Sequence, residues 1–302
     1  MNSYRQAVGV LPEPLRSHAL EVDRSDMVRT EEIRLRVGRR PSLVLSEGEL
    51  TIPGARRVEP EDLKHLMEIA SRWSFHTVLE QMRRGYLTVE GGHRLGVCGT
   101  VVMEGEQIHT LRDITAVNLR VARQITGVAR EITGQLVQAG QLRNTLILGP
   151  PGAGKTTFLR DLVRCISVGE GISPLRVAVA DERGELAAIW AGRPQMDLGE
   201  RTDVLDGCPK ALAIAMLLRG MGPQVIAVDE ITAPEDVLAM EQAVGCGVAL
   251  LATAHGICAD DLQHRPLYRL MLEKRIFQKL IIIRVEGGCR NIRVIEMEDI
   301  LC

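Results

Sequence analysis

One short stretch constrains the fold of this chain more than any other feature. Residues 149–157 read Gly-Pro-Pro-Gly-Ala-Gly-Lys-Thr-Thr, which is the G-x-x-x-x-G-K-[ST] pattern of a phosphate-binding loop. A β-forming apolar run, 145–148, precedes the loop, and apolar residues recur at helical spacing from Phe158 to Ile166. A strand before the loop and a helix after it are the context that the pattern requires. The predicted phosphate-binding residues are Gly149, Pro150, Pro151, Gly152, Ala153, Gly154, Lys155, Thr156 and Thr157.

The residue types in this loop suit a nucleoside triphosphate. Glycine adopts backbone angles closed to other residues, so the loop N–H groups can turn inward around a phosphate at the positive end of the helix. Lys155 adds a positive charge for the β- and γ-phosphates, and the Thr156 hydroxyl is placed to ligate Mg²⁺. We therefore expect a nucleoside triphosphate and Mg²⁺ as ligands; no base-reading motif is evident, so the choice of ATP depends on family resemblance alone. The alternative is a glycine turn followed by an exposed lysine.

Acidic residues follow a second apolar run, 224–228. Asp229 and Glu230 come directly after it, at what would be the carboxyl end of a buried strand. We expect Asp229 to hold Mg²⁺ and Glu230 to polarise the attacking water as general base. The alternative is that the two acids only precede a helix, because 232–235 resembles a capping box.

Two further strand ends carry candidate residues. The apolar run 176–180 leads into the acidic segment 179–185, whose acids are Asp181, Glu182 and Glu185; these would assist metal and water positioning or merely form a solvated strand end. Thr253 and His255 follow the run 248–252 and are candidates for sensing hydrolysis at the γ-phosphate. A lone histidine can equally be a structural residue.

Composition and patterning place these motifs in a two-domain protein. The chain has 302 residues, a formal net charge of -2 and seven cysteines without a C-x-x-C pair. With no secretory signal at the start, these features predict a cytoplasmic protein with reduced thiols. Short strands broken by glycine turns dominate 1–125, whereas apolar strands alternate with helices over 126–302. We expect a smaller α+β domain followed by an α/β, RecA-like P-loop NTPase domain with a mostly parallel sheet, closed by a hairpin of strands 280–285 and 291–297.

The order of the motifs resembles that of the hexameric ATPases of type II and type IV secretion systems and of pilus retraction motors. The phrases 91–96 (GGHRLG), 201–210 (RTDVLDGCPK) and 252–256 (ATAHG) are similar to those of the stage III sporulation protein AA family of endospore-forming bacteria. The resemblance implies an ATPase that assembles as a ring hexamer and energises, from the mother-cell cytoplasm, a secretion-like channel to the forespore. Membrane proteins of that channel complex are the implied partners, and a peripheral position on the mother-cell membrane is the implied location.

The resemblance also implies arginines that reach the nucleotide from the first domain. Arg94 and Arg120 lie in segments similar to the arginine-bearing strands of secretion ATPases, and Arg201 and Arg219 are rivals closer to the nucleotide motifs. One departure concerns the acids: secretion ATPases usually have Gly-Glu where this chain has Asp229 and Glu230. That departure leaves both Glu182 and Glu230 as candidates for the general base.

Two other functions share the same nucleotide motifs. A nucleic-acid-dependent ATPase is disfavoured because residues 1–140 carry 19 Lys and Arg against 18 Asp and Glu. Aromatic residues make up only 3% of the chain, which leaves few platforms for stacking bases. A small-molecule kinase is disfavoured because the acid pair and the histidine motif fit hydrolysis coupled to motion better than transfer to a metabolite.

Overall fold

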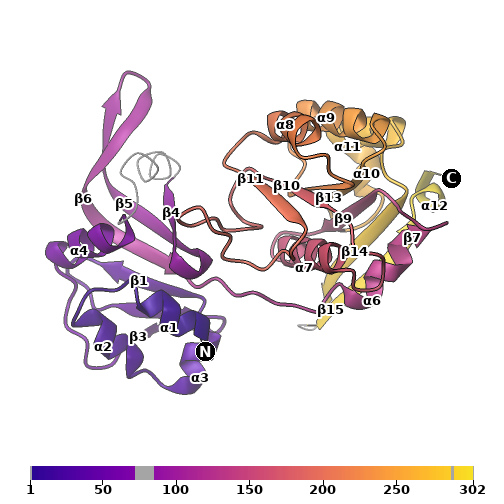
Figure 1. Ribbon diagram of the computed structural model, residues 1–302. Coiled ribbons are helices and arrows are strands. Elements are labelled where there is room, and N and C mark those ends of the chain that lie inside the picture. The colour runs from indigo at the N-terminus through magenta and orange to yellow at the C-terminus, as the bar shows by residue number, and fades with distance from the viewer. Residues whose placement is uncertain (1, 72–84, 287–288, 302) are drawn as a thin grey trace. The chain divides into compact units, whose positions relative to one another are not determined.

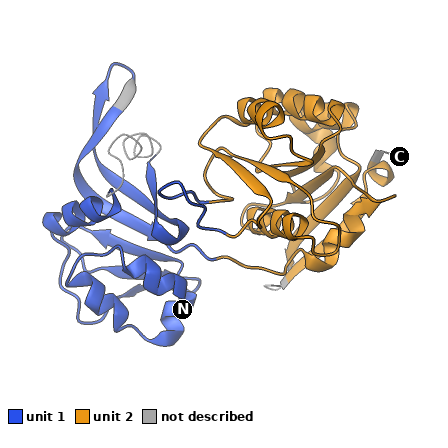
Figure 2. Ribbon diagram, viewed as in Figure 1, with its two compact units in different colours: residues 1–123, 188–196 blue, residues 124–187, 197–302 orange. Residues whose placement is uncertain are grey.

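The computed structural model describes residues 2–71, 85–286 and 289–301, and it divides into two compact units. Unit 1 contains residues 1–123 and 188–196, and unit 2 contains residues 124–187 and 197–302 (Figure 2). The crossing at 123/124 lies next to the boundary expected at 125/126. The segment 188–196, expected in the second domain, groups with unit 1. In the described part of the chain, no helix combines the length and apolar character needed to cross a bilayer.

Unit 1 is an antiparallel sheet with helices packed on one face (Figure 1). Residues alternate along the first strand, where Ile33 and Leu35 are buried and the arginines between and after them face outward. This alternation gives the sheet one apolar and one polar face. The strands, in the spatial order β3-β2-β1-β6-β5-β4, are β1 (Glu32–Arg36), β2 (Ser42–Leu45), β3 (Gly48–Thr51), β4 (Tyr86–Val89), β5 (His93–Glu104) and β6 (Gln107–Arg120). The helices are α1 (Asn2–Val8), α2 (Leu15–Leu20), α3 (Arg24–Arg29) and α4 (Pro60–Ala70), with a 3-10 turn at Glu90–Gly92.

Unit 2 is a seven-stranded sheet in which the last strand alone runs antiparallel to its neighbour. Its strands, in the order β11-β10-β12-β13-β9-β14-β15, are β9 (Thr145–Gly149), β10 (Val177–Asp181), β11 (Thr202–Asp206), β12 (Val225–Val228), β13 (Ala249–His255), β14 (Lys279–Glu286) and β15 (Cys289–Glu296). Every residue of β9, β10 and β12 is buried. Such continuous burial is typical of a parallel sheet covered on both faces.

Helices cover both faces of this sheet (Figure 1). Apolar residues of α8, α9 and α11 share one core with alternate residues of the central strands, while α7 packs on the opposite face. The helices of unit 2 are α6 (Arg130–Thr133), α7 (Lys155–Val168), α8 (Lys210–Gly220), α9 (Pro234–Gly245), α10 (Asp261–His264), α11 (Pro266–Glu273) and α12 (Glu298–Leu301), with a 3-10 turn at Gly134–Leu136 and a small ribbon of β7 (Val137–Gln138) and β8 (Gln141–Leu142). The expected mostly parallel sheet and terminal hairpin are both present.

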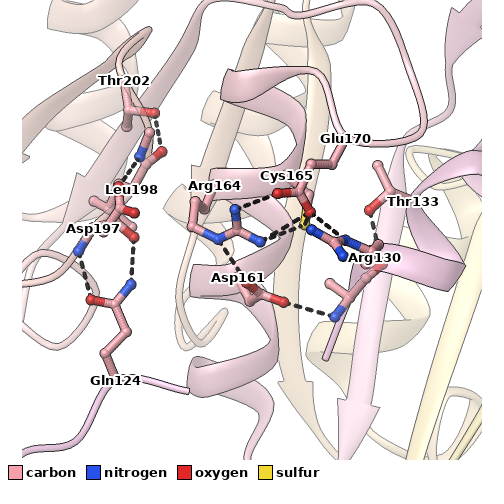
Figure 3. Close-up of polar contacts among 12 residues, drawn as sticks. Gln124, Arg130, Thr133, Asp161, Arg164, Cys165, Glu170, Asp197, Leu198 and Thr202 are labelled. Carbon is pink, nitrogen blue, oxygen red and sulfur yellow. Dashed lines mark hydrogen bonds and ion pairs between the residues drawn. The ribbon is translucent and has the colours of Figure 1, made fainter. Parts of the chain in front are cut away.

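A charged network fixes the carboxyl-terminal half of α7 (Figure 3). Asp161 accepts a hydrogen bond from the backbone N–H of Ala129 at 2.8 Å and another from Arg164 Nε at 2.9 Å. Glu170 binds Arg164 Nη1 at 2.8 Å and Arg130 Nε at 2.9 Å. Because Ala129 and Arg130 belong to the segment that starts α6, this network ties α6 to the helix that begins at the phosphate loop.

Two hydrogen bonds connect the two points at which the chain enters unit 2. The side chain of Gln124 donates to the carbonyl of Asp197 at 2.9 Å and accepts from its backbone N–H at 2.8 Å (Figure 3). Gln124 and Asp197 are the first residues of the two segments that make up unit 2. The two segments are therefore held to each other where they start.

Candidate nucleotide-binding site

The glycine-rich loop connects β9 to α7 as the sequence predicts. Gly152 and Gly154 have φ angles of +75° and +92°, in the left-handed region that favours glycine. Gly149 is extended, but a Cβ there would lie 2.9 Å from the carbonyl oxygen of Ile283 on β14. The loop thus needs glycine for its turn and for the close approach of the neighbouring strand. The first N–H groups of a helix have no partner within the helix, so an anion can bind where α7 begins.

Lys155 is the first residue of α7, and the residue is buried, with 7% of its surface exposed. Nζ donates to the carbonyl oxygens of Gly149 at 2.8 Å and Pro150 at 3.1 Å, and it lies 2.9 Å from Nδ1 of His255. Burial lowers the pKa of Lys155 from its ordinary value, while the nearby carboxylates of Asp229 and Glu230 act in the opposite direction. The ammonium group is therefore desolvated and held at the loop.

Asp229 follows β12 and receives hydroxyl groups on both carboxylate oxygens. Thr156 donates to Oδ2 at 2.9 Å, and Thr253 donates to Oδ1 at 2.7 Å. Burial raises the pKa of Asp229, against the effect of these two hydrogen bonds. Oxygen donors from the helix start and from two neighbouring strands thus meet at one point, and this donor set fits Mg²⁺.

The remaining ligands of such an ion would come from elsewhere. Among the described residues, no group of three or more His, Cys, Asp or Glu side chains is placed to hold a metal. Mg²⁺ commonly binds through one or two protein oxygens, with phosphate oxygens and water completing its octahedron. Thr156 and Asp229 therefore fit a metal that arrives with a nucleotide.

Glu230 is held in an unusual backbone conformation. Its φ angle is +50°, which costs a residue with a side chain about 1 kcal/mol or more. Its backbone N–H donates to the Thr253 hydroxyl at 2.7 Å, and its carboxylate lies 2.7 Å from Arg183 Nη1 and 3.0 Å from His255 Nε2. Contacts from two other segments thus hold the side chain against its backbone strain.

These residues surround a single cavity of about 400 Å³ on the carboxyl-terminal edge of the sheet. It is lined by Pro151, Gly152, Gly154, Lys155, Thr156, Thr157, Glu185, Asp229, Glu230, Thr253, His255 and Arg290. The cavity therefore brings together the phosphate loop, the acid pair and the histidine motif that the sequence analysis selected. It also contains Glu185, the last acid of the segment 179–185, and Arg290, which was not expected at this site.

Glu185 occupies a position for which Glu182 was the sequence-based candidate. Asp181, at the end of β10, accepts backbone N–H bonds from Glu185, Leu186 and Ala187 at 2.8 to 3.2 Å, and so curls the following turn around its carboxylate. Burial raises the pKa of Asp181, although these hydrogen bonds oppose the change. Glu182 instead forms an ion pair with the buried Lys210 of α8 and is not among the cavity-lining residues.

Arg160 supports the same turn and was also missed. It is buried on α7, where Nε donates to the carbonyl of Leu186 at 2.9 Å and Nη2 to that of Glu185 at 2.6 Å. Its position four residues after Thr156 on the helix of the phosphate loop is the signal that could have found it, because i and i+4 residues share a helix face.

The candidate arginines of the first domain lie on neighbouring strands of unit 1. Arg94 on β5 is the cross-strand partner of Arg120 on β6. The Arg94 guanidinium stacks 3.9 Å from the ring centre of Tyr86, and Arg120 lies 3.2 Å from a carboxylate oxygen of Glu32. A role for either arginine at a nucleotide stays a prediction.

The rival arginines belong to unit 2. Arg201 donates to the carbonyl of Ser167 at 3.2 Å, and Arg219 is exposed in the last turn of α8. Neither one lines the cavity.

Comparison with known proteins gives a family for this chain. The family described as "Sporulation stage III, protein AA" matches residues 2–299. The protein of Bacillus subtilis (strain 168) called "Stage III sporulation protein AA" is 38% identical over 280 residues, which make up 92% of this chain and 90% of that protein.

Two solved structures share the fold. The ATPase DotB of Legionella pneumophila is 15% identical, with 89% of this chain and 77% of that chain covered and a TM-score of 0.55. The pilus retraction motor PilT, solved with bound ADP, is 17% identical, with 91% and 82% covered and a TM-score of 0.59. This likeness confirms the α/β, RecA-like P-loop fold expected from the sequence.

Proposed function

Because this chain belongs to the stage III sporulation protein AA family, with the fold of DotB and PilT, we propose that it is a Mg²⁺-dependent ATPase that works as a motor. The observation that carries the proposal is the shared cavity of Lys155, Asp229 and Glu230. Hydrolysis of a nucleoside triphosphate requires a loop that binds phosphates, a carboxylate that binds the metal and a second carboxylate beside it.

The reaction is ATP + H₂O → ADP + phosphate. The loop N–H groups and Lys155 hold the phosphates. Thr156 and Asp229 would hold Mg²⁺, which would neutralise negative charge on the phosphates when bound. Glu230 accepts a proton from water as the new P–O bond forms. The bond between the γ-phosphorus and the bridging oxygen breaks, and that oxygen leaves with ADP.

His255 links the binding and reacting ends of this site. With Nδ1 facing the Lys155 ammonium and Nε2 facing the Glu230 carboxylate, the neutral ring protonated on Nε2 accepts from one and donates to the other. A phosphate that draws Lys155 away from Nδ1 changes the hydrogen bonding of the ring that orients Glu230. We therefore assign His255 as the residue that reports on the γ-phosphate.

The general base is tested by a matched pair of variants. We expect Glu230→Gln to bind ATP but to release phosphate about 10²- to 10⁴-fold more slowly. Glu182→Gln should leave turnover almost unchanged, because Glu182 pairs with Lys210 instead of lining the cavity. Normal turnover in Glu230→Gln would overturn the assignment of the base. Loss of turnover in Glu182→Gln alone would make Glu182 the base.

The interpretation of the chain as a motor is tested by measuring its oligomeric state. We propose that the chain forms a ring hexamer in the mother-cell cytoplasm, docks on membrane proteins of a secretion-like sporulation channel, and supplies that channel with energy. Light scattering should find a six-subunit species with a non-hydrolysable ATP analogue and not with Lys155→Ala, which should bind no nucleotide. Strong stimulation of phosphate release by single-stranded RNA or DNA would instead favour a nucleic-acid-dependent ATPase.

Arg94 and Arg120 are proposed to reach the nucleotide of a neighbouring subunit. A cation supplied in trans makes turnover depend on assembly. Phosphate release per subunit should therefore rise with protein concentration in the natural protein, and this rise should be lost in Arg94→Ala or Arg120→Ala. Arg36→Ala is the control, because Arg36 lies on the same polar face of the sheet and pairs with Glu49, whereas Arg120 pairs with Glu32. An equal loss in the control would count against a specific role.

A further inference from the structure

Arg290 of the carboxyl-terminal hairpin lies directly on the phosphate loop. Its Nε donates to the carbonyl oxygen of Ala153 at 3.1 Å. A Cβ at Gly154 would stand 3.0 Å from the same Nε and 3.4 Å from Cζ and Nη2. Glycine at 154 therefore serves two purposes: it permits the φ angle of +92°, and it leaves room for the guanidinium of Arg290.

Sheet register explains how a residue so late in the chain reaches the loop. β14 runs parallel to β9, with Ile282 opposite Leu148, so both strands end at the same edge. β15 returns antiparallel along β14, with Arg290 opposite Val285, and therefore starts at that edge. The start of β15 is thus brought beside the loop that follows β9.

The order of strands defines which end of a nucleotide Arg290 would meet. β13 and β12, which lead to His255 and Asp229, lie on one side of β9, whereas β14 and β15 lie on the other. The metal-binding pair and the candidate base fix the γ-phosphate end on the β13 side. If the γ-phosphate lies on the β13 side of the loop, the triphosphate extends across the loop and its α-phosphate lies on the side of β14 and β15. Arg290 is on that side.

The chemistry of the side chain fits a phosphate. Arginine presents five N–H donors in a planar fork. Among the described residues, Arg290 donates to Ala153, and this hydrogen bond uses Nε alone. The Nη groups therefore remain available towards the cavity that Arg290 lines. The residues that line this cavity include two cationic side chains, Lys155 and Arg290, and three carboxylates.

We infer that Arg290 binds the α-phosphate of the nucleotide in its own subunit, an inference that rests on the proposed nucleotide binding. This assignment differs in a measurable way from an arginine that acts on the γ-phosphate. ADP and ATP share the α-phosphate, so Arg290 contributes equally to the affinity for substrate and product. An arginine directed at the γ-phosphate distinguishes the two nucleotides.

Calorimetric titration of the full chain with ADP and with a non-hydrolysable ATP analogue tests the inference. Arg290→Ala should weaken both nucleotides by the same factor, roughly 10- to 100-fold, as expected for loss of a hydrogen bond to a charged group. Arg290→Lys should fall between the natural protein and the alanine variant, because lysine keeps the charge and loses the fork. The control is Arg284→Ala, since Arg284 is exposed on β14 of the same hairpin and carries the same charge.

Three outcomes would overturn the inference: unchanged affinity in Arg290→Ala, a loss confined to the ATP analogue, or an equal loss in Arg284→Ala. The melting temperature of each variant without nucleotide separates loss of a contact from loss of the fold. If the natural protein itself binds neither nucleotide while remaining folded, the proposed function fails first. If the natural protein binds both and Arg290→Ala binds them equally well, only the role of Arg290 fails.

Discussion

The ammonium group of Lys155 lies 2.9 Å from Nδ1 of His255, a residue one hundred positions later in the chain. Nε2 of the same ring lies 3.0 Å from the carboxylate of Glu230. The lysine that should hold phosphate and the acid that should activate water therefore share one imidazole ring. Phosphate oxygens must compete with His255 and with two loop carbonyls for the ammonium group, so nucleotide binding and the position of Glu230 are physically linked.

This link predicts separate effects on binding and turnover in His255→Ala. The variant removes one competitor for Lys155, so the KM for ATP should stay the same or fall. It also removes a hydrogen-bond donor from Glu230, so kcat should fall about tenfold or more. Steady-state phosphate release over a range of ATP concentrations measures both constants. A raised KM with an unchanged kcat would mean that His255 only supports ATP binding.

Removal of the metal-binding carboxylate should be visible without any turnover. Asp229→Asn keeps the size of the side chain that Thr156 and Thr253 contact but removes its charge. Its affinity for ADP without Mg²⁺ should equal that of the natural protein, and the gain in affinity on adding Mg²⁺ should shrink by about tenfold. Titrations with and without Mg²⁺ measure this gain. Glu235→Gln, an exposed acid in the first turn of α9, is the control and should retain the full gain.

The network at the end of α7 predicts how stability depends on pH. Hydrogen bonds from Arg164 and Arg130 lower the pKa of Glu170 well below its usual range. A carboxyl whose pKa is lower in the folded state stabilises the protein above its unfolded pKa of about 4.3, and this contribution is lost as the pH falls towards the folded value. Glu170→Gln should therefore lower the free energy of unfolding by about 1 to 2 kcal/mol at neutral pH and by progressively less below about pH 4.

Urea unfolding of the natural protein and of Glu170→Gln at a series of pH values checks this prediction. Glu131→Gln supplies the control, because Glu131 is an exposed acid on α6 and its loss changes the net charge equally. A difference between Glu170→Gln and the natural protein that stays constant down to pH 3 would show that the ionised carboxylate is not what stabilises α7.

The parts of the site that the sequence could predict are those encoded by neighbouring residues. The phosphate loop is one continuous stretch of residues, and Asp229 and Glu230 are adjacent to each other in the chain. Each of these two motifs follows a buried strand of a parallel sheet. Because the carboxyl ends of parallel strands meet at one edge, the loop and the acids were expected to share a pocket. The strands β9, β10, β12, β13, β14 and β15 were predictable for the same reason, since they are apolar runs separated by turns or helices. The strand β11 was not expected, because it is only partly buried and carries no continuous apolar run.

The parts that could not be predicted depend on contacts between distant segments. Glu185 reaches the cavity only because Asp181 gathers three backbone N–H groups and curls the turn between them, whereas Glu182 is drawn to Lys210. Arg290 reaches the loop through the register of a terminal hairpin that no motif marks. Segment 188–196 groups with unit 1 although the sequence on both sides of it belongs to unit 2.

The backbone of Glu230 allows strain to be measured at the candidate base itself. Its φ angle of +50° lies in the region that glycine adopts freely and alanine does not. Glu230→Gly and Glu230→Ala both lose the carboxylate and its contacts with Arg183 and His255, so they differ only in the Cβ methyl group and in the backbone freedom that it restricts. The glycine variant gains from relief of strain and loses through the greater entropy of its unfolded chain.

We expect relief of strain to dominate. Glu230→Gly should therefore be more stable than Glu230→Ala by about 1 kcal/mol in urea unfolding without nucleotide, although neither should hydrolyse ATP. Equal or greater stability of the alanine variant would mean that the turn after β12 relaxes out of the left-handed region at little cost, and Glu230 would then not be held in place by its backbone.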